Sequence, residues 1–376
     1  MGDVKHFMFL LQTALLVSAF PWQPLSSFAA AVPLQTRTPT QQQFDCKGQD
    51  PEALTARARA HLKRGDETEA QRLLACALAI RPDAFSANLT FGKLLLSQQS
   101  YPEAMDRFET ALATHVRDPE ARAGELTAAT QLALHARQSG NQDAALKCLQ
   151  HARLHLADDP TLLTDLGIQA HLLHQLPEAS EALNAALRLR PNSSTALYAL
   201  ARVETDWQRF PAAESHLRAY LVTHPDDASA HFGLGHLLFM QQHLEDARTE
   251  FNRSIELQPL QTESYYQIGQ MDLDAHADAD AAVLFEKALG RNPRHGGALT
   301  GMGILAYRAK QYTSARGRLT AAVESSPGYQ PAHYYLGLTL ARLGEKAASD
   351  HELALATQLT ETQHAAPHSP APLAPE

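Results

Sequence analysis

The chain has 376 residues, enough for two or three ordinary domains, and its 44% hydrophobic and 19% charged residues are typical of a folded soluble protein. A net charge of −9 and the lack of any lysine or arginine run argue against a nucleic-acid binder, which needs a basic face. Alanine and leucine dominate the composition, and both residues favour helices.

The first residues have the pattern of a targeting segment. Lys5 precedes an apolar stretch, Phe7–Phe20, which Pro21 ends and which small residues follow at 29–31. We therefore expect residues 1–31 to be a secretory signal peptide and the protein to be periplasmic or secreted. The apolar stretch is shorter than the ~20 residues of a transmembrane helix. The alternative is an uncleaved membrane anchor.

Residues 32–50 are polar, contain proline and glutamine, and are predicted to form a linker. The chain has three cysteines, Cys46, Cys76 and Cys148. Export would place them in an oxidising compartment, where Cys46 could pair with Cys76 and leave Cys148 as a buried thiol. The alternative is three free thiols, because sequence alone does not fix connectivity.

Three series of residues recur along the chain at the same interval, and each series keeps a fixed offset from the other two. Prolines recur at Pro191, Pro225, Pro259, Pro293 and Pro327. Glycines recur at Gly167, Gly235, Gly269, Gly303 and Gly337, with Ala201 in the one missing place. Alanines recur at Ala179, Ala213, Ala247, Ala281 and Ala315. A fixed period of this length indicates a stack of small, similar structural units.

The spacing inside one unit predicts two helices. In residues 192–225, one apolar stripe of helical period precedes a break at residues 208–211, and a second stripe follows it. The two stripes comprise Leu197, Leu200, Ala201, Ala213, Leu217 and Tyr220. Pro225 closes the unit, because proline cannot continue a helix interior. The small residue of the glycine series lets the first helix approach its neighbour closely, and a larger side chain there would cost about 1–3 kcal/mol.

This pattern resembles the tetratricopeptide repeat (TPR) family, whose unit of about 34 residues has small-residue and proline landmarks. The Phe-x-x-Ala landmark of the second helix appears at Phe108 with Ala111 and at Phe285 with Ala288. The resemblance covers residues 51–361 and implies an all-α fold, a right-handed α-solenoid of about nine helix-turn-helix units. The units start near Pro51, Phe85, Leu126, Pro160, Ser194, Ala228, Thr262, Gly296 and Gln330.

One unit is irregular. The distance from the second unit start to the third exceeds the regular period by seven, so seven residues are inserted between them. Asp118 and Pro119 have the pattern of a helix start, which predicts that the first helix of the third unit begins early and is about two turns longer. The alternative is a loop insertion, which Gly124 would allow.

We expect no second folded domain at the ends, since residues 362–376 are proline-rich and predicted to be a disordered tail. No catalytic motif is present. His351 and Glu352 lack the second histidine of a zinc-protease motif, and no phosphate-binding loop, nucleophile elbow or Cys-x-x-Cys pair occurs. We therefore expect neither an enzyme nor a cofactor.

Two patterns could suggest a metal. His151 and His155 could share a helix face, as could His171 and His174, but no further ligand follows at a defined spacing. Residues 272–280 alternate acidic side chains through an inter-helix turn, without the glycine and glutamate that an EF-hand uses. We expect solvated side chains in both places and no metal.

In proteins similar to this one, the first helix of each unit lines a concave groove, chiefly at unit positions 2, 5, 9 and 12. Aromatic residues recur at these positions in the C-terminal half. The predicted peptide-binding residues are Tyr198, Arg202, Phe232, His236, Phe239, Tyr266, Gln270, Tyr307 and Tyr334. Tyrosine and phenylalanine with a few polar neighbours are typical of peptide grooves. The alternative is that the position-5 aromatics fill the seam between units.

The sequence thus predicts a non-enzymatic scaffold that binds a protein or peptide partner and is exported to the cell envelope. Some TPR modules hold a carboxylate with lysine at position 5 and asparagine at position 9, and this pair does not occur here. Two alternatives remain. One is a membrane-anchored structural subunit of an envelope assembly, and the other is an accessory subunit of an enzyme on a separate chain.

Overall fold

Acidic caps followed by prolines mark the beginnings of three units. Asp50, Asp118 and Asp159 each precede a proline at the start of a helix, and their carboxylates accept hydrogen bonds from N–H groups of the first turn. The Asp118 carboxylate, for example, lies 2.8 Å from the Ala121 nitrogen. These local interactions help to fix where the first helix begins in each of these three units.

The computed structural model describes residues 46 and 48–365. The predicted signal peptide, most of the predicted linker and residues 366–376 lie outside the described residues. Across the described ranges the chain forms eighteen helices and no strand. The first helices of the units are α2 (Pro51–Leu62), α4 (Phe85–Ser97), α6 (Pro119–Gln138), α8 (Pro160–Leu172), α10 (Ser194–Asp206), α12 (Ala228–Met240), α14 (Thr262–Asp274), α16 (Gly296–Arg308) and α18 (Gln330–Leu343). The second helices are α3 (Glu67–Ile80), α5 (Tyr101–Thr114), α7 (Gln142–Ala152), α9 (Leu176–Leu189), α11 (Phe210–Thr223), α13 (Leu244–Leu257), α15 (Asp278–Arg291), α17 (Tyr312–Ser325) and α19 (Lys346–Ala365).

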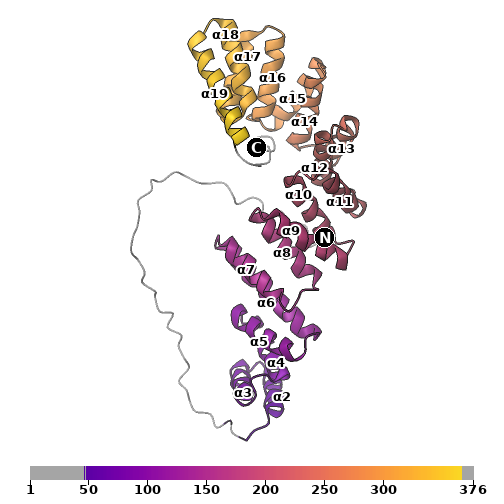
Figure 1. Ribbon diagram of the computed structural model, residues 1–376, viewed down its shortest axis with the longest axis vertical. Helices are drawn as coiled ribbons and strands as arrows, with labels where there is room; N and C mark the ends of the chain where they lie inside the picture. Colours follow the sequence, from indigo (N-terminus) through magenta and orange to yellow (C-terminus); the bar gives the residue numbers. More distant parts are fainter. Residues whose placement is uncertain (1–45, 47, 366–376) are drawn as a thin grey trace, which may run out of the picture. The chain divides into compact units, whose positions relative to one another are not determined.

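The helices pack in chain order. Each first helix contacts the second helix of its own unit, and that second helix contacts the first helix of the next unit (Figure 1). First helices also touch one another directly, as α14 touches α16 and α16 touches α18. The predicted all-α solenoid of helix pairs is therefore confirmed. In the part of the chain that the structure describes, no helix combines the length and hydrophobicity needed to cross a membrane.

A left-handed residue follows the first helix of each unit. Its φ is positive at three glycines, Gly65, Gly140 and Gly344, and at six other residues. Those six are Gln99, His174, Gln208, Gln242, His276 and Lys310, with φ between 56 and 63°. A left-handed residue turns the chain sharply after a helix, which lets the second helix fold back against the first.

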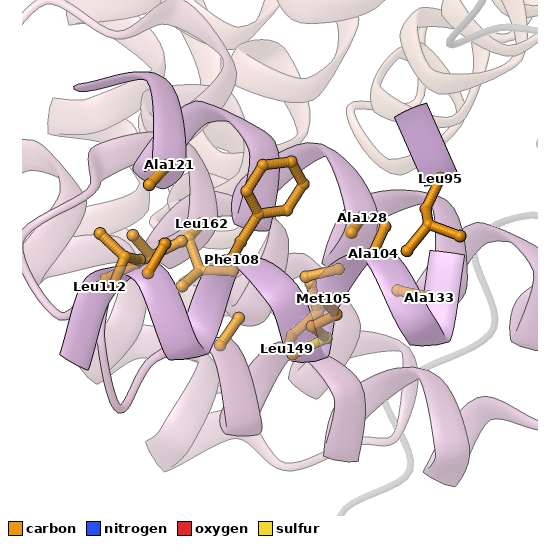
Figure 2. Packing of buried hydrophobic residues seen from close by; sticks show 14 of the residues in the cluster. Leu95, Ala104, Met105, Phe108, Leu112, Ala121, Ala128, Ala133, Leu149 and Leu162 are labelled. Atoms are coloured by element: carbon orange, nitrogen blue, oxygen red, sulfur yellow. The ribbon is translucent and has the colours of Figure 1, made fainter. Parts of the chain in front are cut away.

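The largest core side chains are phenylalanine rings, and they pack against glycines of the first helices. Phe285 of α15 is fully buried, and its ring occupies the space that Cβ atoms at Gly269 of α14 and Gly301 of α16 would fill. Phe108 of α5 is held in the same way between Gly92 and Gly124. Figure 2 shows the Phe108 ring among small and aliphatic side chains of the neighbouring helices. The glycines thus allow one ring to join two successive units.

The third unit begins at Pro119, one regular period after the start of α4 and seven positions before the predicted unit start at Leu126. Helix α6 has 20 residues, whereas α8 has 13, so the inserted residues lengthen the helix and do not form a loop. At the other end, α19 runs to Ala365, so residues 362–365, which were expected in the disordered tail, are helical. The last helix, with 20 residues, is longer than the second helices of the other units, which have 11 to 14 residues.

A disulfide joins Cys46 to Cys76 of α3, so the segment that precedes the first unit is tied to that unit. Cys148 of α7 is a free, partly buried thiol, and burial raises its pKa. Of the two arrangements that the sequence allowed, the structure has the paired one.

Candidate peptide-binding groove

First helices of the last four units enclose a hollow of about 360 Å³. We call it the α12–α18 groove. It is lined by His236, Phe239, Tyr266, Gln267, Gln270, Leu273, Asp274, Thr300, Ile304, Arg308, Tyr329, Pro331 and Tyr335. All of these residues belong to α12, α14, α16 and α18 except Tyr329, which directly precedes α18.

Helical spacing explains why one face of each first helix reaches the groove. In α14, Tyr266, Gln270 and Leu273 are four and three positions apart, so they lie on one side of the helix. In α16, Thr300, Ile304 and Arg308 are spaced four apart. Gly269 of α14 and Gly303 of α16, which pack against second helices, stand beside this stripe. The groove face overlaps the core, since Tyr266, Leu273 and Ile304 are each at most 7% exposed.

Four of the nine predicted residues line the groove, namely His236, Phe239, Tyr266 and Gln270. The other five do not line it, and they are Tyr198, Arg202, Phe232, Tyr307 and Tyr334.

Neighbouring rings account for three of these five, including Tyr307, whose ring lies 5.6 Å from that of Tyr312 of α17. The Tyr198 ring lies 5.0 Å from that of Tyr220, and the Phe232 ring lies 5.6 Å from that of the core residue Phe251. Both side chains therefore pack against second helices. Arg202 is exposed, and Tyr334 is 42% exposed beside Tyr335.

Tyr266 belongs both to the groove wall and to the seam between units. It is only 6% exposed, and its ring fills the space where a Cβ at Gly297 of α16 would lie. Its hydroxyl is 3.3 Å from the hydroxyl of Tyr329, and burial raises the pKa of both phenols. At this position the alternative interpretation holds, in which the aromatic ring fills the seam between units, because the next unit covers most of the ring.

Sequence reasoning missed several groove residues. Gln267 and Tyr335 stand at unit position 6, and Asp274 and Arg308 stand at position 13, each one residue after an expected groove position. The recurrence of both positions in more than one unit is a signal that a wider helical stripe would have captured. Tyr329 lies in the turn between units, where no helical period points to it.

The polar groups of the groove are only partly paired. The Gln270 Nε2 group donates a hydrogen bond to Asp274 at 2.9 Å, and Arg308 contacts the Leu273 carbonyl at 3.0 Å and Asp278 at 2.7 Å. The Nδ1 atom of His236 is buried without a hydrogen-bond partner. Burial also lowers the pKa of His236, so its ring is neutral at pH 7 and can donate or accept one hydrogen bond. The groove thus offers aromatic surface with a few polar groups, a lining suited to binding.

The acidic residues around 272–280 do not converge on one point. Asp272 pairs with Arg248 at 2.6 Å, Asp278 pairs with Arg308, and Asp274 accepts from Gln270. Each carboxylate therefore has a separate partner that positions a helix end or the groove wall.

Comparison of the sequence with known families gives the same repeat. Family models for the tetratricopeptide repeat match residues 61–126, 173–221, 198–261, 271–329 and 300–361. The chain belongs to the tetratricopeptide repeat family. TPR proteins bind protein or peptide partners, and this membership supports a protein-interaction scaffold. TPR scaffolds are generally non-enzymatic.

Solved TPR structures resemble this TPR protein in part. MamA from Desulfovibrio magneticus RS-1 is 24% identical over 44% of this chain and 93% of its own, with a TM-score of 0.43. The pilF protein of Pseudomonas aeruginosa is 22% identical over 54% of this chain and 91% of its own, with a TM-score of 0.46. YrrB, described as a TPR protein with an unusual peptide-binding site, is 19% identical over 49% of this chain and 95% of its own, with a TM-score of 0.41. No curated protein is significantly similar in sequence.

Proposed function

We propose that this TPR protein is an exported, non-enzymatic scaffold that holds an extended peptide or a helix of a partner protein in the α12–α18 groove. The observation that carries the proposal is the hollow itself. It is built from the same face of four successive first helices and has aromatic walls. A surface assembled from rigid, packed helices is preformed, so a partner does not have to order it on binding.

The size of the hollow suits anchor side chains of a longer partner. Its volume of about 360 Å³ lies at the lower end of the range for ligand pockets, roughly 300–1,000 Å³. Phe239 and Tyr335 are partly buried and present ring surface to it, while Gln267 and Gln270 provide amide donors and acceptors. We propose that one or two apolar side chains of the partner enter the hollow and that its backbone pairs with the amides. Such aromatic anchors carry most of the energy at protein interfaces.

The first prediction concerns the groove. Immobilised wild-type protein should capture a partner from an envelope extract, and mass spectrometry identifies the protein that then serves as the probe. Replacing Phe239 or Gln270 with alanine should weaken binding of the purified probe about tenfold or more, because an anchor surface or a hydrogen bond is lost. Isothermal titration calorimetry measures the affinity, and far-UV circular dichroism verifies helicity.

A matched control comes from the second helices. Val283 of α15 is 51% exposed and lies outside the groove, so Val283→Ala should bind the probe as the wild type does. If Phe239→Ala and Gln270→Ala both bind with wild-type affinity while remaining helical, the groove is not the binding site.

Export is supported by the apolar segment at residues 7–20 and by the Cys46–Cys76 disulfide, since disulfides persist mainly in oxidising compartments. The second prediction follows from both features. Protein isolated from the envelope fraction without reductant should begin at Val32 and show one reactive thiol after denaturation, that of Cys148. N-terminal sequencing and thiol titration measure these two quantities. Retention of residues 1–31 would instead indicate a membrane anchor, and three thiols would contradict an oxidising location.

A further inference from the structure

A charged residue occupies a core position in the irregular third unit. Glu125 is the seventh residue of α6, and its side chain is fully buried. The seventh residues of the other first helices after α2 are apolar. They are Phe91, Leu166, Leu200, Leu234, Ile268, Met302 and Leu336. The exchange of a core hydrophobe for a carboxylate is costly unless the charge has a partner.

Glu125 is one of three potential metal ligands that lie close together. Glu109 of α5, Glu125 of α6 and His155, which follows α7, each offer an atom within 4.8 Å of the other two. The Nδ1 atom of His155 lies 3.0 Å from one Glu125 oxygen. His151 stands beside the cluster, with its Nε2 atom 2.8 Å from a Glu109 oxygen.

The cluster is incompletely paired by the protein alone. The second oxygen of Glu125 is buried without a hydrogen-bond partner. The Glu109 oxygen beside His151 is also buried, and its contact with that ring does not have the geometry of a hydrogen bond. Two carboxylates this close repel each other, whereas buried charges in proteins are generally paired or bound to metals. An uncompensated oxygen within a group of ligand atoms therefore points to a cation.

We propose that Glu109, Glu125 and His155 bind a divalent transition metal ion, with zinc as the first candidate. Zinc accepts imidazole nitrogen and carboxylate oxygen in tetrahedral sites. Ligands about 2.1 Å from the ion lie about 3.4 Å apart in such a site, so donors within 4.8 Å of one another reach it through small side-chain shifts. Such an ion neutralises the buried carboxylates and links α5, α6 and the turn after α7 where the regular repeat is interrupted.

Metal titration of the full-length protein tests this proposal. After treatment with a chelator, the protein is titrated with Zn²⁺ by calorimetry and with Co²⁺ by visible absorption, which reports a tetrahedral environment. The wild type should bind one equivalent in this site. Glu125→Gln and His155→Asn should each weaken binding of that equivalent about tenfold or more, because each removes a ligand.

A control substitution at another histidine distinguishes metal binding at this site from unspecific binding of metal to histidines. His231 pairs with Glu250 at 2.6 Å in a similar ion pair, so His231→Asn should leave the high-affinity equivalent unchanged. His155 is partly exposed, so we expect His155→Asn to fold. This variant still tests the site if Glu125→Gln fails to fold. The proposal is overturned if the wild type gives neither heat nor tetrahedral cobalt bands, or if a folded His155→Asn binds as tightly as the wild type.

Discussion

Gly301→Ala is expected to lower the free energy of unfolding by about 1–3 kcal/mol, at the upper end of this range, because it overpacks a closed site. The new Cβ would lie 2.4 Å from the Cε2 and Cζ atoms of Phe285, closer than atoms in contact allow. The ring has little space to retreat, since it is fully buried and also lies against Gly269. Urea unfolding followed by far-UV circular dichroism measures the loss.

The control for this substitution is a second glycine to alanine change in the next helix. A Cβ at Gly317 of α17 would meet nothing within 4 Å, so Gly317→Ala should stabilise the protein by about 0.5–1 kcal/mol through helix propensity alone. A double variant with Phe285→Leu should recover part of the loss from Gly301→Ala, because the smaller side chain vacates the clash. Equal stability of Gly301→Ala and the wild type would show that the ring is not held as described.

The repeat period predicted the fold because each landmark has a local cause. Proline cannot continue a helix, and the aspartate caps at Asp118 and Asp159 begin one, so the sequence alone places most helix starts. The third unit was the difficult case. Its unit register pointed to Leu126, but Gly124 lies against Phe108 of α5 and belongs inside the helix. Asp118 and Pro119 predicted the early helix start, which the structure confirms, but the loop alternative that Gly124 allowed is rejected only by this contact between two helices.

Groove residues were harder to predict than helices. The repeat period identifies which face of the helix lines the groove, but it does not give the direction of each side chain on that face. Positions 6 and 13 were therefore missed, although the neighbouring positions 5 and 12 were expected to line the groove. Burial also depends on the neighbour. Tyr266 is covered because Gly297 of the next unit leaves room for its ring, whereas Tyr334 of the last unit remains exposed.

The proposed metal site shows a different limit of sequence reasoning. His151 and His155 gave only a four-residue spacing, while the carboxylates come from two other helices. Glu109 and Glu125 approach these histidines because α5, α6 and α7 pack in succession. Alignment of Glu125 with the apolar seventh residues becomes visible only once α6 is known to begin at Pro119. The signal was therefore present but depended on the correct helix start.

A buried carboxyl in α8 makes stability depend on pH. Burial raises the pKa of Asp165 from 3.8 to about 6, with Arg137 acting in the opposite direction and Asp159 in the same direction. Because the folded-state pKa exceeds that of the unfolded chain, the native state binds this proton more tightly. The contribution of Asp165 to stability is thus fully present below pH 4 and is lost as the pH rises from about 4 to 6.

Asp165→Asn should therefore raise the free energy of unfolding at pH 7.5 by about 1–3 kcal/mol, allowing for the partial exposure of the side chain. At pH 4 the variant and the wild type should be equally stable, because the carboxyl is then largely protonated in the native state. Urea unfolding at the two pH values measures both differences. Asp350 of α19 is exposed, and Asp350→Asn serves as the matched control. A variant less stable than the wild type at pH 7.5 would mean that attraction to Arg137 outweighs the cost of burying the charge.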